Sequence, residues 1–222
     1  MLLEIACFEI HSAEIALNSV ADRIEFCAEG HLGGTTPNVD EFRYLRSKYQ
    51  QPIYVMIRPK GGDFFYSNEE FETMKRSLIE FYDAGADGFV FGMLANGNRV
   101  DAERCRELIN LAKDRPCTFH RAFDHTPDLD QAMKAIIQLG FRTVLTSGGK
   151  NSAMEGKDNL QHLVKNYADS IDVLLGGGVR SSNIVELRDY TQAKHFHSSA
   201  ILPYEMFANE EEIKKLKAQL QS

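Results

Sequence analysis

Ionisable side chains follow a short apolar run near the middle of the chain. The segment 116–124, P-C-T-F-H-R-A-F-D, reads as a strand from Cys117 to His120 that runs into Arg121 and Asp124. Histidine and carboxylate side chains are common general acids and bases, and arginine is suited to binding anions. A strand that ends in such residues indicates a site, and we take His120 and Asp124 as candidate catalytic residues.

Polar side chains also end several other strand-like runs. The side chains among them that could take part in catalysis or binding are Glu25 with Cys27, Arg58, and His197 followed by Ser198 and Ser199. The starts of the same runs carry few such residues. Glu25, Arg58 and His197 therefore join the candidate catalytic residues. His120 or Glu25 would act as the general acid or base, because burial can bring either pKa near neutrality.

A glycine-rich turn supplies a second kind of signal. The sequence G-G-G-V-R-S-S at 176–182 follows a strand-like run and precedes a helical pattern. Glycine lets backbone N–H groups approach an anion, and a helix start adds partial positive charge. We therefore predict anion binding at Gly177 and Gly178, with Ser198 and Ser199 on the neighbouring loop. The alternative is a tight turn that only satisfies backbone geometry.

The elements that must position these residues alternate strictly. Strand-like runs occur at 2–7, 22–27, 52–58, 87–91, 117–120, 142–146, 171–175 and 194–197. Helical patterns occur at 12–20, 38–49, 68–84, 101–113, 128–139, 159–167, 182–190 and 209–220. Such alternation predicts parallel strands joined by right-handed crossovers. With no G-x-G-x-x-G or P-loop sequence, it favours one (β/α)8 TIM-barrel domain over 1–222, with the barrel body at 1–202.

Strand alternation predicts which side chains enter the barrel. Glu4 and Glu25 lie on the faces opposite the apolar residues of their strands, so both should point into the lumen. Buried carboxylates need cationic or hydrogen-bonding partners. Arg58 and Arg121 are the candidates, although Arg121 shares the parity of Phe119, which would turn it outward. The alternative is that this polar layer only holds the sheet in register.

The bulk composition limits the partners. A net charge of −7 argues against nonspecific nucleic-acid binding. The chain has no apolar run long enough for a membrane span, no basic segment typical of a signal peptide near Met1, and no C-x-x-C pair among its four cysteines. We therefore expect a cytoplasmic protein with reduced thiols, without nucleic-acid or membrane partners.

Several short runs, in this order, resemble those of the CutC family. They are E-F-C at 25–27, G-G-T-T-P at 33–37, M-I-R-P-K-G-G-D-F at 56–64, T-F-H-R-A-F-D at 118–124, L-T-S-G at 145–148, G-G-G-V at 176–179 and F-H-S-S-A at 196–200. Together they cover nearly all of residues 2–202. The resemblance implies a cytoplasmic (β/α)8 barrel, often a homo-oligomer, with a role in copper homeostasis and Cu(I) as the ion bound.

The resemblance also implies a ligand pair, since the copper ligands proposed in some members are two cysteines at the ends of the first two strands. Cys27, which shares the strand parity of Glu25, matches the second. Ala6 occupies the usual position of the first, and Cys7, one residue later, faces the other way by strand parity. Three functions therefore stay open from the sequence. One is Cu(I) binding through Cys27 and Cys7. Another is an acid–base enzyme acting on a small phosphorylated or carboxylated metabolite. A scaffold that acts through its outer helices is a third.

Overall fold

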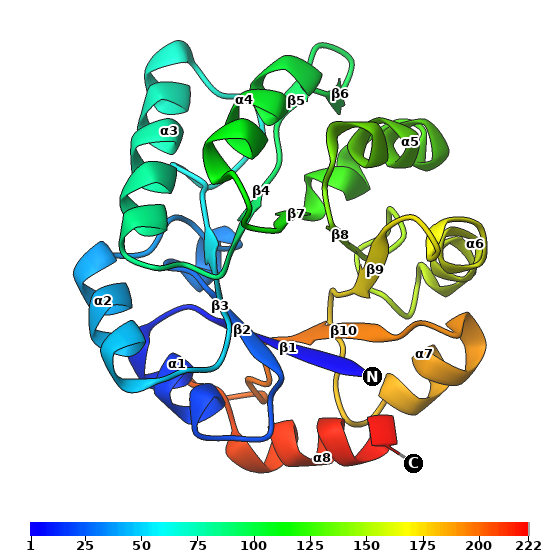
Figure 1. Ribbon diagram of the computed structural model, residues 1–222. Coiled ribbons are helices and arrows are strands. Elements are labelled where there is room, and N and C mark those ends of the chain that lie inside the picture. Colours follow the sequence, from blue (N-terminus) through cyan, green and yellow to red (C-terminus); the bar gives the residue numbers. More distant parts are fainter. Residues whose placement is uncertain (222) are drawn as a thin grey trace.

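The computed structural model describes residues 1–221 as a closed barrel. Eight parallel strands join in the order β1-β10-β9-β8-β7-β4-β3-β2, and β2 pairs with β1 to complete the circle. Eight α-helices form a ring outside these strands (Figure 1). The prediction of a single-domain (β/α)8 barrel is confirmed.

Every predicted strand and helix overlaps an observed one. The barrel strands are β1 (Leu2–Cys7), β2 (Arg23–Phe26), β3 (Ile53–Met56), β4 (Gly88–Phe91), β7 (Cys117–Phe119), β8 (Thr143–Thr146), β9 (Asp172–Leu175) and β10 (His195–Ser198). The helices are α1 (Ile10–Leu17), α2 (Val39–Lys48), α3 (Asn68–Asp83), α4 (Ala102–Ala112), α5 (Leu129–Leu139), α6 (Lys157–Tyr167), α7 (Ile184–Thr191) and α8 (Glu210–Gln221).

Four short elements were not predicted. An antiparallel hairpin of β5 (Leu94–Ala95) and β6 (Arg99–Val100) follows β4. The 3-10 turn η1 (Gly30–Leu32) follows β2, and η2 (Arg121–His125) follows β7. Both 3-10 turns lie beyond the carboxyl ends of strands, where they shape the loops of the site.

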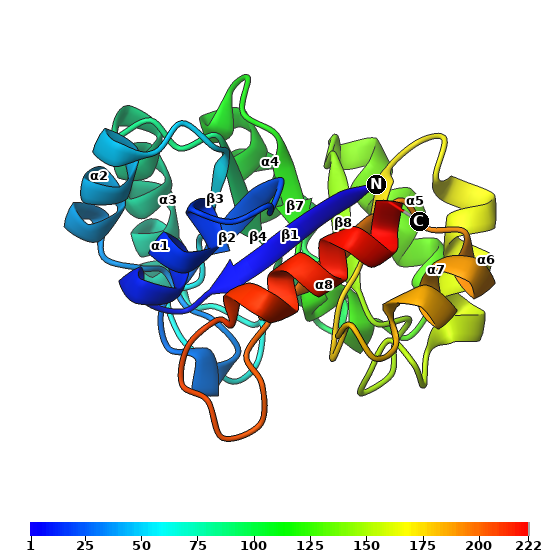
Figure 2. The same ribbon diagram turned by 90° about the horizontal axis from the view of Figure 1, so that it is seen from below.

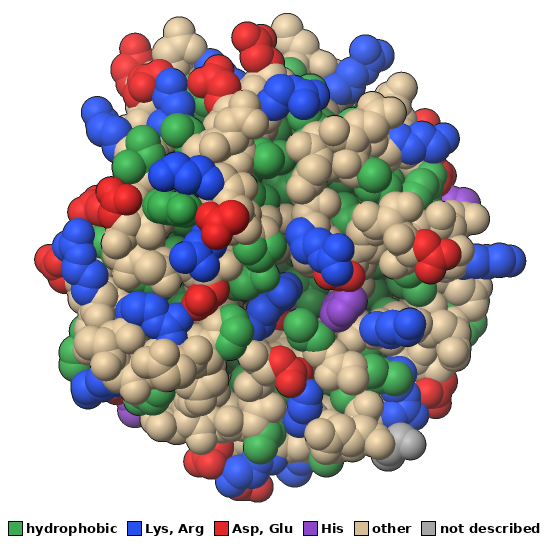
Figure 3. Space-filling model, in the orientation of Figure 1, with side chains coloured by type: hydrophobic (Ala, Val, Ile, Leu, Met, Phe, Trp, Pro, Cys, Tyr) green, Lys and Arg blue, Asp and Glu red, His purple; other side chains and the backbone are tan. Residues whose placement is uncertain are grey.

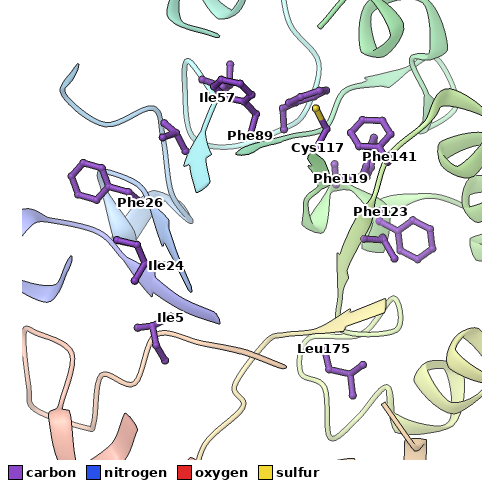
Figure 4. Packing of buried hydrophobic residues seen from close by; sticks show 14 of the residues in the cluster. Ile5, Ile24, Phe26, Ile57, Phe89, Cys117, Phe119, Phe123, Phe141 and Leu175 are labelled. Carbon is purple, nitrogen blue, oxygen red and sulfur yellow. The ribbon is translucent and has the colours of Figure 1, made fainter. Parts of the chain in front are cut away.

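The main hydrophobic core lies between the strands and the helices. Alternate strand residues such as Ile5, Phe26 and Phe119 are fully buried in this layer, and Figure 4 shows them among the apolar side chains that surround the barrel. The helices complete the layer with amphipathic faces. In α5 that face ends at Gly140, whose φ of +97° suits the left-handed residue that closes a helix.

The lumen has a smaller, mixed filling. Cys27, Tyr54, Met56 and Val90 form an apolar cluster there. The Tyr54 ring lies against Gly88, where an added Cβ would come within 2.7 Å of the ring. The lumen also holds the polar side chains of Glu4, Arg23 and Glu25, as strand alternation predicted, while the apolar Ala6 and Leu145 line its open end.

All barrel strands run in one direction. In Figure 2, β1 points toward the side where the loop between β10 and α8 projects, so this side is the carboxyl end of the barrel. Figure 3 shows acidic and basic side chains interspersed over one face of the molecule. Within residues 1–221, no helix combines the length and apolar character needed to cross a bilayer.

Candidate functional site

A cavity of about 430 Å³ opens at the carboxyl ends of the strands. Its wall includes most residues predicted for the site: Glu25, Arg58, His120, Gly177, Gly178, His197, Ser198 and Ser199. Parallel strands of a barrel end at one edge, so residues far apart in the chain meet there. Of the other predicted residues, Asp124, Cys7 and Cys27 lie outside this wall.

Glu4 lies below the cavity and joins two cations. Its carboxylate accepts a hydrogen bond from Arg23 Nε, and its Oε1 lies 2.7 Å from Nδ1 of His197. Burial alone would raise the pKa of Glu4, but Arg23 and His197 outweigh it and lower that pKa to about 2. Burial likewise opposes a charge on His197, yet the hydrogen bond to Glu4 and the nearby Glu25 raise its pKa. The contact therefore favours the charged forms of both Glu4 and His197.

The Glu25 side chain reaches the cavity floor and has few hydrogen-bond partners. Its Oε2 accepts a hydrogen bond from Cys27 Sγ at 3.3 Å and lies 3.9 Å from Nε2 of His197. Its Oε1 is buried and has no hydrogen-bond partner among the described residues. Burial, together with the charge of Glu4, raises the pKa of Glu25 despite the opposing effect of His197. This carboxyl group is poised to meet a ligand or to carry a proton.

Glu4, Glu25 and His197 are also close enough to surround a cation. Their ligand atoms lie within 4.8 Å of one another. Two carboxylates and an imidazole form a donor set suited to a divalent metal ion. However, Arg23 already occupies one oxygen of Glu4, so a metal would have to compete with an internal ion pair.

His120 faces the cavity as a neutral imidazole. Its Nδ1 accepts a hydrogen bond from the backbone N–H of Ala122, so the ring proton belongs on Nε2. That Nε2 is buried without a partner among the described residues. Burial, and to a lesser degree Arg58, lower the pKa of His120 to about 3. His120 can therefore donate one hydrogen bond to a ligand near neutral pH.

We expect nitrogen NMR spectra to show His120 as the neutral Nε2–H tautomer throughout pH 5–8. The reason is that a charge on this ring would be buried beside Arg58. His197 is the internal control, because its raised pKa should make it titrate above the ordinary value of 6.5. A His120 transition between pH 5 and 8 would contradict the assignment.

Arg58 does not contact the lumen carboxylates, so its predicted role as their partner is wrong. The guanidinium donates to the backbone carbonyls of Leu32, Gly34 and Gly62, at 3.0, 2.9 and 2.9 Å. It lies beyond the end of β3 and ties together the loops after β2 and β3. Arg23 is the residue that pairs with Glu4, since the two stand opposite each other in the β1–β2 register.

Arg121 was also misplaced by strand alternation. Because β7 ends at Phe119 and η2 begins at Arg121, the pleat no longer applies, and Arg121 turns into the cavity wall. Its Nε donates to Asp124 at 2.9 Å and one Nη donates to Ser147 Oγ at 2.7 Å. Arg121 therefore partners Asp124 and not the lumen carboxylates.

Asp124 fixes η2 to the loop after β8. Besides Arg121, its carboxylate accepts hydrogen bonds from Thr146 Oγ1, from the N–H and hydroxyl of Ser147, and from the N–H of Gly149. A carboxylate this well supplied with donors has little capacity left for a ligand. These contacts indicate that Asp124 positions the cavity wall, although the sequence suggested it as a catalytic residue.

Arg180 is a cavity residue that the sequence analysis missed. Its guanidinium donates to the hydroxyls of Ser198 and Ser199, both at 3.1 Å, and to the carbonyl of Ile201 at 3.0 Å. Its position directly after G-G-G-V was a usable signal, because a cation beside a glycine turn suits an anion. Helix α7 starts at Ile184 and not at the predicted residue 182, so a turn at 181–183 separates the glycines from the helix.

The two cysteines of interest face opposite sides of the barrel. The β1–β2 register runs without a bulge, so Cys7 stays in the outer core with Ile5. Cys27 belongs to the lumen cluster. Since Phe26 pairs with Val55, Cys27 stands level with Met56 on the adjacent strand. Burial raises the pKa of both thiols well above the ordinary value.

Comparisons with known proteins agree on one family. The CutC family model matches residues 1–202. The chain is 40% identical over 199 residues to the copper homeostasis protein cutC homolog of Homo sapiens, covering 90% of this chain and 73% of that protein. It is 37% identical to the family protein CutC of Treponema denticola, covering 90% and 81%. The crystal structure of CutC from Streptococcus agalactiae superposes with a TM-score of 0.83 at 28% identity, covering 90% and 98%.

Proposed function

This chain belongs to the CutC family, and from that premise we propose that it serves copper homeostasis by holding Cu(I) as cargo at Cys27. Several relatives carry copper homeostasis in their names. We place this role in the cytoplasm, where thiols stay reduced, because Cys7, Cys27, Cys105 and Cys117 are all free.

The observation that supports this function best is the pairing of Cys27 with Met56. The two side chains stand level on adjacent strands and share the lumen cluster. Both also reach Gly34, where an added Cβ would lie 3.4 Å from Cys27 Sγ and 3.6 Å from Met56 Cε. Thiolate and thioether sulfurs are soft ligands that favour Cu(I). The lumen therefore offers one thiol and one thioether side by side.

This pair replaces the two-cysteine site that the family resemblance implied. Ala6 lines the cavity where a second lumen thiol would stand, while Cys7 points into the outer core. The Cys27 thiol must also lose its proton before it binds the metal, because the thiolate is the ligand. Since burial raises the pKa of this thiol, Cu(I) affinity should increase as the pH rises.

Anaerobic competition of the protein with a chromogenic Cu(I) chelator tests the proposal. We expect one equivalent of Cu(I) bound by the wild type and none by Cys27→Ala. Met56→Leu should weaken binding about tenfold, since it removes a soft ligand of similar size. Cys7→Ala and Cys117→Ala are the matched controls, because both remove a buried thiol outside the lumen.

The same titration can refute the proposal. Undiminished Cu(I) binding by a folded Cys27→Ala variant would do so, as would loss of binding only in Cys7→Ala. Circular dichroism and thermal melts of each variant separate loss of the ligand from loss of the fold.

A further inference from the structure

Two cations of the cavity wall lack an anionic partner. Arg58 is 3% exposed, donates to three backbone carbonyls and lies over the Phe64 ring, all of which are uncharged groups. Arg180 is half-buried and donates to hydroxyls and carbonyls, and Glu212 attracts it only from beyond ion-pair distance. Within residues 1–221, neither guanidinium has a carboxylate oxygen within 4.0 Å. Buried charges are normally paired, so this wall calls for an anion.

The glycine turn beside Arg180 presents free backbone donors. Gly177 and Gly178 have φ angles of +93° and +78° and both line the cavity. The N–H groups of Gly177, Gly178 and Val179 donate no hydrogen bond to any described residue. Successive free N–H groups in such a turn form a concave anion-binding surface.

Close packing explains the glycine at 177. An added Cβ there would lie 3.0 Å from Ser147 Cβ and 3.5 Å from the Arg121 guanidinium. The turn is thus pressed against a third cation, whose charge is balanced by Asp124. Arg180 therefore supplies the unbalanced positive charge next to the free N–H groups.

We propose that this wall binds the phosphate group of a small organic phosphate. The N–H groups of Gly177 and Gly178 and the Arg180 guanidinium would hold the phosphate oxygens, and Arg58 would balance the second negative charge from across the cavity. A phosphate dianion matches two unpaired guanidinium groups, which a single carboxylate does not. Arginine and backbone N–H groups are the usual ligands of phosphate.

The volume and lining of the rest of the cavity indicate the size and polarity of the organic part of the ligand. A volume of about 430 Å³ leaves room for a short carbon chain beside the phosphate. His120 Nε2 and Glu25 Oε1 are buried, lack partners among the described residues, and belong to cavity-lining side chains. These atoms suit the hydroxyl or carbonyl groups of a polar chain. The site is therefore distinct from the Cys27–Met56 pair, of which only Met56 lines this cavity.

The test uses protein freed of metal by a chelator, so that its outcome does not depend on copper. Inorganic phosphate and glycerol 3-phosphate are titrated at constant ionic strength, with amide NMR as the readout. We expect saturable shifts at Gly177, Gly178 and Ser199, and tighter binding of glycerol 3-phosphate than of inorganic phosphate. Succinate tests the carboxylate alternative, and glycerol tests for binding without the phosphate.

Arg180→Met should weaken glycerol 3-phosphate binding about tenfold or more, because it removes a charged fork but keeps the apolar stem. Arg142→Met is the matched control. Arg142 lies at the start of β8, at the opposite end of the barrel, and its side chain is 70% exposed. Its loss should change affinity by less than about twofold, since exposed distant charges are screened.

Three results with the wild type would overturn the proposal. They are the absence of saturable shifts in the wild type, shifts that map away from the glycine turn, and equal binding of succinate. Equal affinities of the Arg180→Met and Arg142→Met variants would overturn it as well. If Arg180→Met does not fold, Arg180→Lys replaces it, because lysine keeps the positive charge. The amide shifts of the wild type then decide whether the phosphate binds at the glycine turn.

Discussion

Glu4→Gln is expected to lower the free energy of unfolding by about 3–5 kcal/mol. Glu4 is fully buried and pairs with both Arg23 and His197. A neutral amide would leave the buried Arg23 charge without a counter-ion, and that loss is more costly than the original pair was favourable. Urea denaturation of the wild type and the variant measures the difference.

Asp40→Asn is the matched control for this change. Asp40 pairs with Arg43 on the exposed surface of α2, where both side chains are more than half exposed. Surface ion pairs of this kind contribute about 0–1 kcal/mol. If Glu4→Gln destabilises the protein no more than Asp40→Asn does, the lumen ion pair does not hold the barrel together.

The same pair gives the unfolding free energy a defined pH dependence. The pKa of Glu4 falls from 4.5 to about 2 on folding, so its contribution is present above pH 4.5 and is lost as the pH falls toward 2. The pKa of His197 rises above 6.5, so its contribution is present below pH 6.5 and is lost as the pH rises through the raised value. Glu4→Gln should flatten both slopes in denaturation curves recorded from pH 3 to 9.

Asp124→Ala is expected to cost about 3 kcal/mol or more of unfolding free energy. The carboxylate accepts bonds from the backbone N–H groups of Ser147 and Gly149 and from three side chains, and alanine would leave several of these donors unsatisfied. The loop after β8 should then detach from η2 and become sensitive to proteases. Urea denaturation and limited proteolysis followed by mass spectrometry measure the two effects.

A second aspartate on the same segment serves as the comparison. Asp128 caps α5 through a single bond to the N–H of Gln131, and its loss should cost about 1 kcal/mol. An Asp124→Ala variant as stable as Asp128→Ala would show that Asp124 does not anchor the wall. Its suggestion as a catalytic residue would then regain weight.

The sequence was most informative where periodicity decides the outcome. Alternating strand and helix patterns predicted the barrel, and strand parity placed Glu4, Glu25 and Cys27 toward the lumen. The same parity kept Cys7 outside. These predictions depend only on the alternation of side chains along a strand, which can be read from the sequence of that strand alone.

Predictions failed where neighbouring strands or turns determine the orientation or the partner of a side chain. Pairing Glu4 with Arg23 requires the β1–β2 register, which no single strand encodes. Arg121 changes sides because η2 interrupts the pleat. The β5–β6 hairpin did carry a local signal, since Asn-Gly is typical of hairpin turns and Asn96-Gly97 lies in its three-residue connection.

The contact between Glu4 and His197 joins residues 193 positions apart. They meet because β10, the last barrel strand in the sequence, pairs with β1, the first. Until β10 docks, β1 has no partner along that side and presents an open sheet edge. The chemically active groups come together only in the final step, so a truncated or late-stalled product would be both unstable and inert.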